Sequence, residues 1–130
     1  MALNEGNCER DYLYGRLLAV ADRIEFRTLE RDENGKVTES RQTNAKRFMN
    51  AFSQQPFRTW KVIEEQIQPY LLKLSIQDRL FFTSLIDEIC WKFQDEDFEK
   101  NDGLNGLYLL GFHHQIYKLR YDKEEEKRDE

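Results

Sequence analysis

The sequence predicts an all-α protein, a compact bundle of about five helices, and three observations support this fold class. Apolar residues recur every three or four positions in several long segments, which is the period of an α-helix. Of the 130 residues, 39% are hydrophobic and 35% are charged, which suits a small helical domain with a densely charged surface. An Asn-Gly pair at residues 34–35 can close a β-hairpin, but its flanks are weak strand material and favour a helix–loop–helix arrangement.

The chain length predicts one domain over residues 1–130, with flexible ends at residues 1–8 and 122–130. No apolar run reaches the length of about 20 residues that spans a bilayer, and the N-terminus lacks a signal-peptide pattern. We therefore expect a cytoplasmic protein without membrane contacts. Cys8 and Cys90 are far apart and are not spaced like metal ligands, which predicts free thiols.

The first helix is expected over residues 9–31, because apolar residues at steps of four, three and four define one face. That face consists of Leu13, Leu17, Val20 and Ile24. A second stripe beside it consists of Arg16, Arg23 and Arg27. Two interpretations of this stripe are open: a solvated flank whose long stems cover the edge of the core, or a surface that contacts phosphate groups.

Two helices are expected in the middle of the chain. One covers residues 39–52 and ends at the polar sequence 53–55, which breaks the apolar pattern. The other covers residues 56–74, because Pro56 suits the first turn of a helix. Pro69 lies inside this second helix and lacks a backbone N–H, so it predicts a kink or a break.

The C-terminal third predicts two more helices, separated by a loop. A serine cap begins a helix over residues 75–93, and residues 94–103 form an acidic loop whose spacing fails the pattern of a calcium site. Residues 104–121 are apolar on nearly every side, which predicts the central helix of the bundle. Gly106 and Gly111 cost helix propensity there, so we expect close backbone packing at both.

The charge distribution singles out residues 41–63. This segment holds five basic residues and no acidic one, whereas the rest of the chain holds 15 basic and 25 acidic residues. Basic side chains interleaved with aromatic and amide groups suit a nucleic-acid strand, because cations meet phosphates and planar groups meet bases. The alternative is a solvated helical face that happens to lack acids. The net charge of −5 argues against indiscriminate nucleic-acid binding.

No catalytic, metal-binding or cofactor-binding constellation is recognisable. His113 and His114 are adjacent, so on a helix they point about 100° apart and do not share one metal easily. We expect one of them near the core edge and the other exposed. The carboxylate pairs 64–65 and 87–88 do not converge, and the chain has no glycine-rich phosphate loop. We therefore expect a non-enzymatic protein without cofactor or metal.

Three motifs are distinctive. They are YLYGRLLAV at residues 12–20, Arg47-Phe48 followed by Ala51 and Pro56, and LLGFHHQ at residues 109–115. With these motifs the chain resembles the C-terminal helical region of the type I-C CRISPR large subunit. That region is also made separately as the small subunit of the Cascade surveillance complex. A Met1 directly before an acidic lead-in fits a short product translated from within a longer reading frame.

The resemblance implies a helical, non-catalytic subunit with four kinds of partner: the large subunit, the guide-RNA backbone subunits, further copies of itself, and nucleic acid. It implies that basic residues hold the displaced single-stranded DNA or the guide RNA and help to keep the R-loop open. Carried onto this sequence, the candidates are Arg16, Arg23, Arg27, Lys46, Arg47, Arg58 and Lys61. The alternative function is an acidic helical adaptor that binds only protein.

Overall fold

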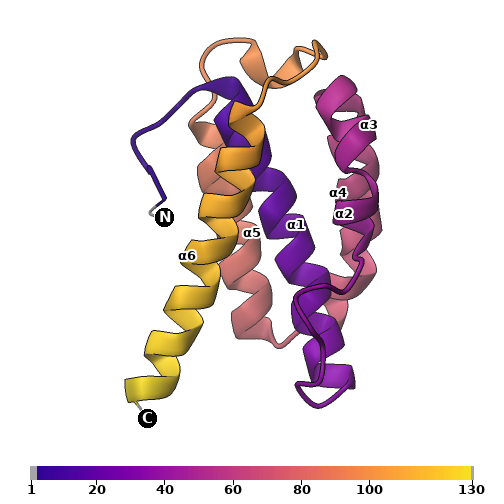
Figure 1. Ribbon diagram of the computed structural model, residues 1–130, viewed down its shortest axis with the longest axis vertical. Helices are drawn as coiled ribbons and strands as arrows, with labels where there is room; N and C mark the ends of the chain where they lie inside the picture. The colour runs from indigo at the N-terminus through magenta and orange to yellow at the C-terminus, as the bar shows by residue number, and fades with distance from the viewer. Residues whose placement is uncertain (1–2, 130) are drawn as a thin grey trace.

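The computed structural model describes the backbone of residues 3–129 and the side chains as far as Arg120, and this part of the chain is all-α, without a strand. The elements are α1 (Arg10–Asp32), α2 (Asn44–Arg47), α3 (Met49–Gln54), α4 (Pro56–Lys73), α5 (Ile76–Trp91), the short 3₁₀ helix η1 (Asp97–Glu99) and α6 (Leu107–Asp129) (Figure 1). The predicted fold class is therefore confirmed. No described helix is long and apolar enough to cross a membrane.

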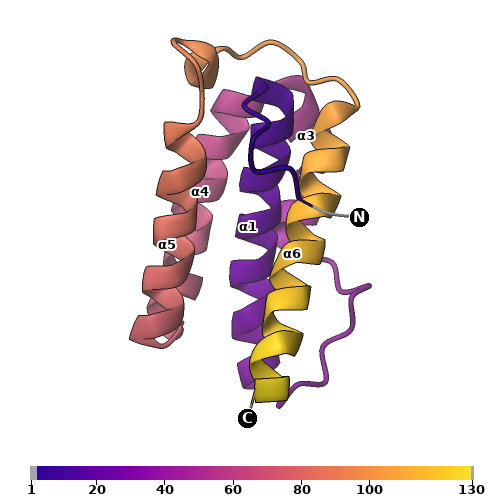
Figure 2. The ribbon, with the colours of Figure 1, turned by 90° about the vertical axis from the view of Figure 1, so that its left-hand side faces the viewer.

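Helix α1 is the centre of the bundle. Every residue from Tyr12 to Phe26 is buried, and α1 packs against α2, α4, α5 and α6. Figure 2 shows it running between α5 and α6, with α4 behind α5. The prediction that the last helix is central is wrong, because Leu109, Leu110 and Tyr117 of α6 are exposed. Helix α1 contains charged residues, which are typical of a surface helix. Those between Tyr12 and Phe26 are buried here because other segments supply partners for them.

Helices α1 and α6 make the most extensive contact in the fold, and two glycines allow it. A Cβ at Gly15 would overlap the carbonyl oxygen of Tyr108, and one at Gly111 would overlap that of Tyr12. The close packing expected at Gly111 is therefore confirmed. The same expectation is wrong for Gly106, which precedes α6 and where an added Cβ would meet open space.

The expected helix over residues 39–52 is two short helices. Residues 33–43 form a connection, after which Thr43 caps α2 by accepting a hydrogen bond from Lys46 N at 3.2 Å. The helical hydrogen bonding changes at Phe48, which separates α2 from α3. Helix α4 begins at Pro56 as predicted and continues through Pro69 to Lys73.

The acidic loop between α5 and α6 is anchored by one aromatic side chain. Phe98, in η1, stacks on Tyr14 with ring centroids 5.8 Å apart and packs edge-on against Phe57 and Phe93. The carboxylates of the loop stay at the surface or near it, while Phe98 joins the edge of the core. The acidic loop is therefore fixed to α1, α4 and α5 through Phe98.

Candidate nucleic-acid interface

Arg16 lies inside the protein. Its residue is 1% exposed, and its Nε donates a hydrogen bond of 2.7 Å to Oε1 of Gln115 in α6. Burial lowers the pKa of this guanidinium, and the nearby Glu88 opposes that effect. Its Nη1 is buried without a hydrogen-bond partner among the described residues. In this fold Arg16 joins α1 to α6.

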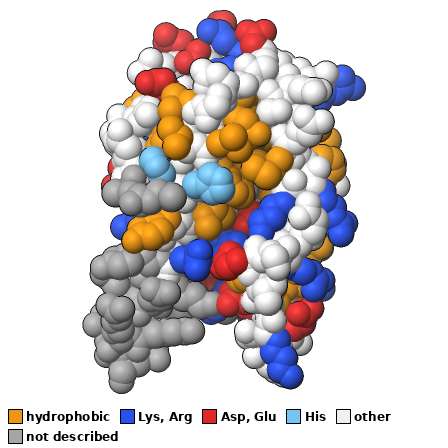
Figure 3. All heavy atoms as spheres, in the orientation of Figure 1, with side chains coloured by type: hydrophobic (Ala, Val, Ile, Leu, Met, Phe, Trp, Pro, Cys, Tyr) orange, Lys and Arg blue, Asp and Glu red, His pale blue; other side chains and the backbone are white. Residues whose placement is uncertain are grey.

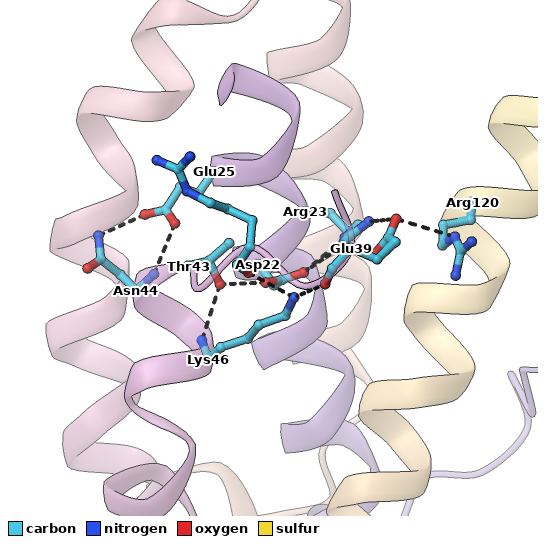
Figure 4. A network of polar contacts seen from close by, with 9 residues as sticks. Asp22, Arg23, Glu25, Glu39, Thr43, Asn44, Lys46 and Arg120 are labelled. Carbon is cyan, nitrogen blue, oxygen red and sulfur yellow. Dashed lines mark hydrogen bonds and ion pairs between the residues drawn. The ribbon is translucent and has the colours of Figure 1, made fainter. Parts of the chain in front are cut away.

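Arg23 belongs to a buried polar network that Figure 4 shows. Its Nη2 lies 2.8 Å from Oδ2 of Asp22 and 3.1 Å from Oε2 of Glu39, and its guanidinium lies over the Phe26 ring at 4.1 Å. Arg120 of α6 approaches the other oxygen of Glu39 at 3.5 Å. Arg23 thus fixes the connection at residues 33–43 to α1.

Lys46 holds the same connection from the other side (Figure 4). Its Nζ donates to the carbonyl oxygens of Glu39 at 2.8 Å and Arg41 at 3.1 Å. Thr43 donates to Asp22 at 2.5 Å, so the cap of α2 is tied to α1. Two of the cations in the sequence-predicted set, Arg23 and Lys46, therefore have partners within one network.

Arg27 is half-buried and paired across the bundle. Its Nε lies 3.1 Å from Oδ2 of Asp78, in the first turn of α5. The arginine stripe of the first helix thus runs from buried Arg16 and Arg23 to the half-buried, paired Arg27. The interpretation as a solvated flank is wrong for Arg16 and Arg23, which are buried.

The remaining three candidates, Arg47, Arg58 and Lys61, are exposed. None of them forms an ion pair with a residue that the structure describes. Arg58 and Lys61 are three positions apart in α4 and share a face, and Lys61 Nζ lies 4.2 Å from the centre of the Phe57 ring. Helices α2, α3 and α4 lie on one side of the bundle (Figure 1), along which Figure 3 shows Lys and Arg side chains.

The two histidines of the motif at residues 109–115 lie as expected. His113 is exposed and His114 is half-buried, with Nδ1 2.9 Å from the hydroxyl of Tyr12. The described residues contain no group of three or more His, Cys, Asp or Glu side chains that could hold a metal ion. Cys8 and Cys90 are free thiols, as predicted.

The sequence motifs did not reveal a groove between α4 and α5. Both helices pack on α1 but barely on each other, and a groove of about 360 Å³ lies between them. Glu64 and Glu65 line it from α4, and Asp87 lines it from α5. Trp91, at the end of α5, is 87% exposed. Apolar residues lie on more than one side of α5, so periodicity alone does not decide which side faces water.

Comparison with known proteins places the chain in a family. The family model described as CRISPR-associated protein (Cas_Csd1) matches residues 1–120. No curated protein matches the chain. Two of the three motifs, at residues 12–20 and 109–115, form the α1–α6 crossing, so the resemblance rests on a packed interface. The chain belongs to the Cas_Csd1 family of CRISPR-associated proteins, and it is a component of the type I-C Cascade system.

Proposed function

We propose that this protein is the non-catalytic small subunit of a type I-C Cascade complex. In this role the face formed by α2, α3 and the first half of α4 contacts the displaced DNA strand, the guide-RNA backbone, or both. The contact stabilises the R-loop, whose formation is close to energy balance, so a few backbone contacts shift the equilibrium. The other Cascade subunits and further copies of this chain are its partners.

The observation that carries the proposal is the combination of three exposed cations and a segment without acids. Arg47, Arg58 and Lys61 project from α2 and α4, and none of them forms an ion pair with a described residue; residues 41–63 hold no carboxylate, and Glu64 and Glu65 follow Lys61 by about one helical turn. An exposed, unpaired cation keeps its charge available for a phosphate, whereas Arg16 and Arg23 are already engaged. We therefore narrow the proposed contact set to these three residues.

The acidic remainder of the chain limits where a strand can bind. Outside residues 41–63 the charge balance is negative, so phosphates are repelled from most of the surface. Binding that depends on the assembled complex fits this distribution, because neighbouring subunits then present the strand to the basic face. The isolated chain is expected to bind nucleic acid weakly.

The test compares target-DNA binding by the remaining type I-C complex with and without this protein across a salt series. If the chain holds the strand, adding it tightens binding, and the gain shrinks as salt rises. Each lost contact to a single-stranded phosphate changes the slope of log K against log salt by about 0.7. An addition that changes nothing at any salt concentration contradicts strand holding and favours the adaptor function.

A further inference from the structure

The groove between α4 and α5 has an apolar floor and an acidic rim. Its volume is about 360 Å³, and it opens to solvent. The floor consists of Ile67, Leu71 and Ile86. The rim consists of Glu64, Glu65 and Asp87. Among the residues that the structure describes, no lysine or arginine lines it. A groove of this kind differs in chemistry from the basic face on α2, α3 and the first half of α4.

The rim carboxylates are not neutralised within the fold. None of the three forms an ion pair with a described residue. Nearby cations are directed elsewhere: Lys61 lies over Phe57, and Arg79 donates to the carbonyl oxygens at the end of α4. Burial, followed by the charges of Glu64 and Asp87, raises the pKa of the Cys90 thiol.

An exposed apolar stripe adjoins the groove on α5. Ile76, Leu80, Asp87 and Trp91 are four, seven and four positions apart, so they share one face of the helix. Ile76 is 71% exposed, Leu80 59% and Trp91 87%. Large apolar side chains grouped on a surface mark interaction sites, and tryptophan is frequent among the residues that dominate interface energies.

We propose that this surface docks a basic amphipathic helix of another protein subunit of the complex. The apolar side of such a helix, with residues at spacings of three and four, would lie on Ile67, Leu71 and Ile86, beside Leu80 and Trp91. Its flanking lysines or arginines would meet Glu64, Glu65 and Asp87. Helix-in-groove binding uses this combination of an apolar floor and complementary charge at the rim.

Charge argues against two other occupants. A nucleic-acid strand would bring phosphates against three unpaired carboxylates, which is repulsive. A second copy of this chain has a net charge of −5 and offers the rim only one basic face, on α2, α3 and the first half of α4, so it matches the rim less well than a segment that is basic throughout. A basic segment of a different protein subunit is the remaining match. This proposal does not depend on strand holding at the basic face, so the two can fail separately.

A photo-crosslinking residue in the assembled complex tests the proposal. Gln68 lines the groove and is exposed, whereas Gln66 is exposed on nearly the opposite side of α4. Benzoylphenylalanine at position 68 should crosslink to a lysine- or arginine-rich segment of another protein subunit, as mapped by mass spectrometry. The same group at position 66 should not. Crosslinks from position 68 to nucleic acid or to a second copy, or no crosslink at all, would overturn the proposal.

Charge reversal on the rim supplies a second, independent measurement. The double variant Glu64→Lys with Asp87→Lys should reduce the crosslink from position 68 roughly tenfold, because it places like charges opposite the partner. Asp32→Lys, an exposed carboxylate at the end of α1, is the matched control and should leave the yield unchanged. Circular dichroism establishes that both variants fold. An undiminished crosslink in the folded double variant would contradict a basic partner.

Discussion

Gly15 of α1 and Gly111 of α6 lie at one helix crossing, and each faces the backbone of the opposite helix. A Cβ on either residue would lie within 3.0 Å of a backbone carbonyl oxygen, a separation that real Cβ atoms essentially never show. The two helices therefore approach as closely as their main chains allow. This contact sets the position of every residue that joins α1 to α6.

Alanine at position 111 should destabilise the protein. The added methyl group meets the rigid backbone of Tyr12 and must push the helices apart, an overpacking that costs about 1–3 kcal/mol or more. Urea unfolding of Gly111→Ala against the wild type measures the loss. Gly106→Ala is the matched control, because nothing lies near its Cβ. Equal stability of the two variants would contradict the crossing as described.

The hydrogen bond between Arg16 and Gln115 should contribute to stability rather than to nucleic-acid binding. Gln115→Ala leaves the buried Nε of Arg16 without its partner, which should cost about 1–3 kcal/mol of unfolding free energy. The double variant Arg16→Met with Gln115→Leu should recover most of this loss, since it removes both buried polar groups. A double variant that is less stable than Gln115→Ala would argue against this account.

Glu39 should make stability depend on acidic pH. Burial alone would raise the pKa of Glu39, but the hydrogen bond from Arg23 and the charges of Arg23, Arg120 and Lys46 outweigh it and lower the pKa below 4.5. The folded protein thus takes up this proton less readily than the unfolded chain. The contribution is fully present above pH 4.5 and is lost as the pH falls through the folded pKa.

Glu39→Gln removes this pH-dependent contribution. At pH 7 we expect the variant to lose less than about 1 kcal/mol of unfolding free energy, because the carboxylate is partly exposed. At strongly acidic pH its unfolding free energy should differ little from that of the wild type. Urea unfolding at pH 7 and at lower pH measures both. Glu33→Gln, in the exposed pair with Arg41, is the control for losing one carboxylate. A difference between Glu39→Gln and the wild type that stays constant with pH would contradict the prediction.

Cys90 should react slowly with alkylating agents. Burial, together with the charges of Glu64 and Asp87, raises the pKa of its thiol from 9.0 to about 11, so the thiolate is scarce at neutral pH. In a Cys8→Ser variant, the rate with iodoacetamide should keep rising to about pH 11, whereas in denaturant it levels off near the ordinary pKa. The double variant Glu64→Gln with Asp87→Asn should lower the midpoint of this pH–rate curve. An alkylation rate that levels off near pH 9 in the folded protein would contradict the raised pKa of Cys90.

Reversal of the exposed cations should weaken R-loop formation. Arg58→Glu with Lys61→Glu removes two proposed contacts to a single strand, so the salt slope of target binding should fall by about 1.4 in magnitude. Lys36→Glu, an exposed cation outside residues 41–63, is the matched control with the same charge change per residue. Target binding by the assembled complex is the measurement. A slope equal to that of the control would remove these two residues from the contact surface.

Local signals in the sequence were sufficient for much of the fold. The period of the apolar residues located the long helices. One proline and one serine marked two of their starts: Pro56 begins α4, and Ser75 caps α5 by accepting a hydrogen bond from Asp78 N at 3.1 Å. The basic segment was also evident, because charge is counted directly from the residues. The break at Phe48 was missed, since a change between two short helices leaves little trace in periodicity.

The sequence by itself determined the all-α class, the long helices and the contrast between residues 41–63 and the acidic remainder, because these follow from local spacing and composition. Only the tertiary structure decided which helix is central, which arginines are free and where the α4–α5 groove lies. Arg16 and Gln115 are 99 residues apart, and such pairing decides whether a charged side chain meets water or a buried partner. Helical periodicity gives each helix an apolar face, but the identity of its neighbour depends on contacts between distant segments.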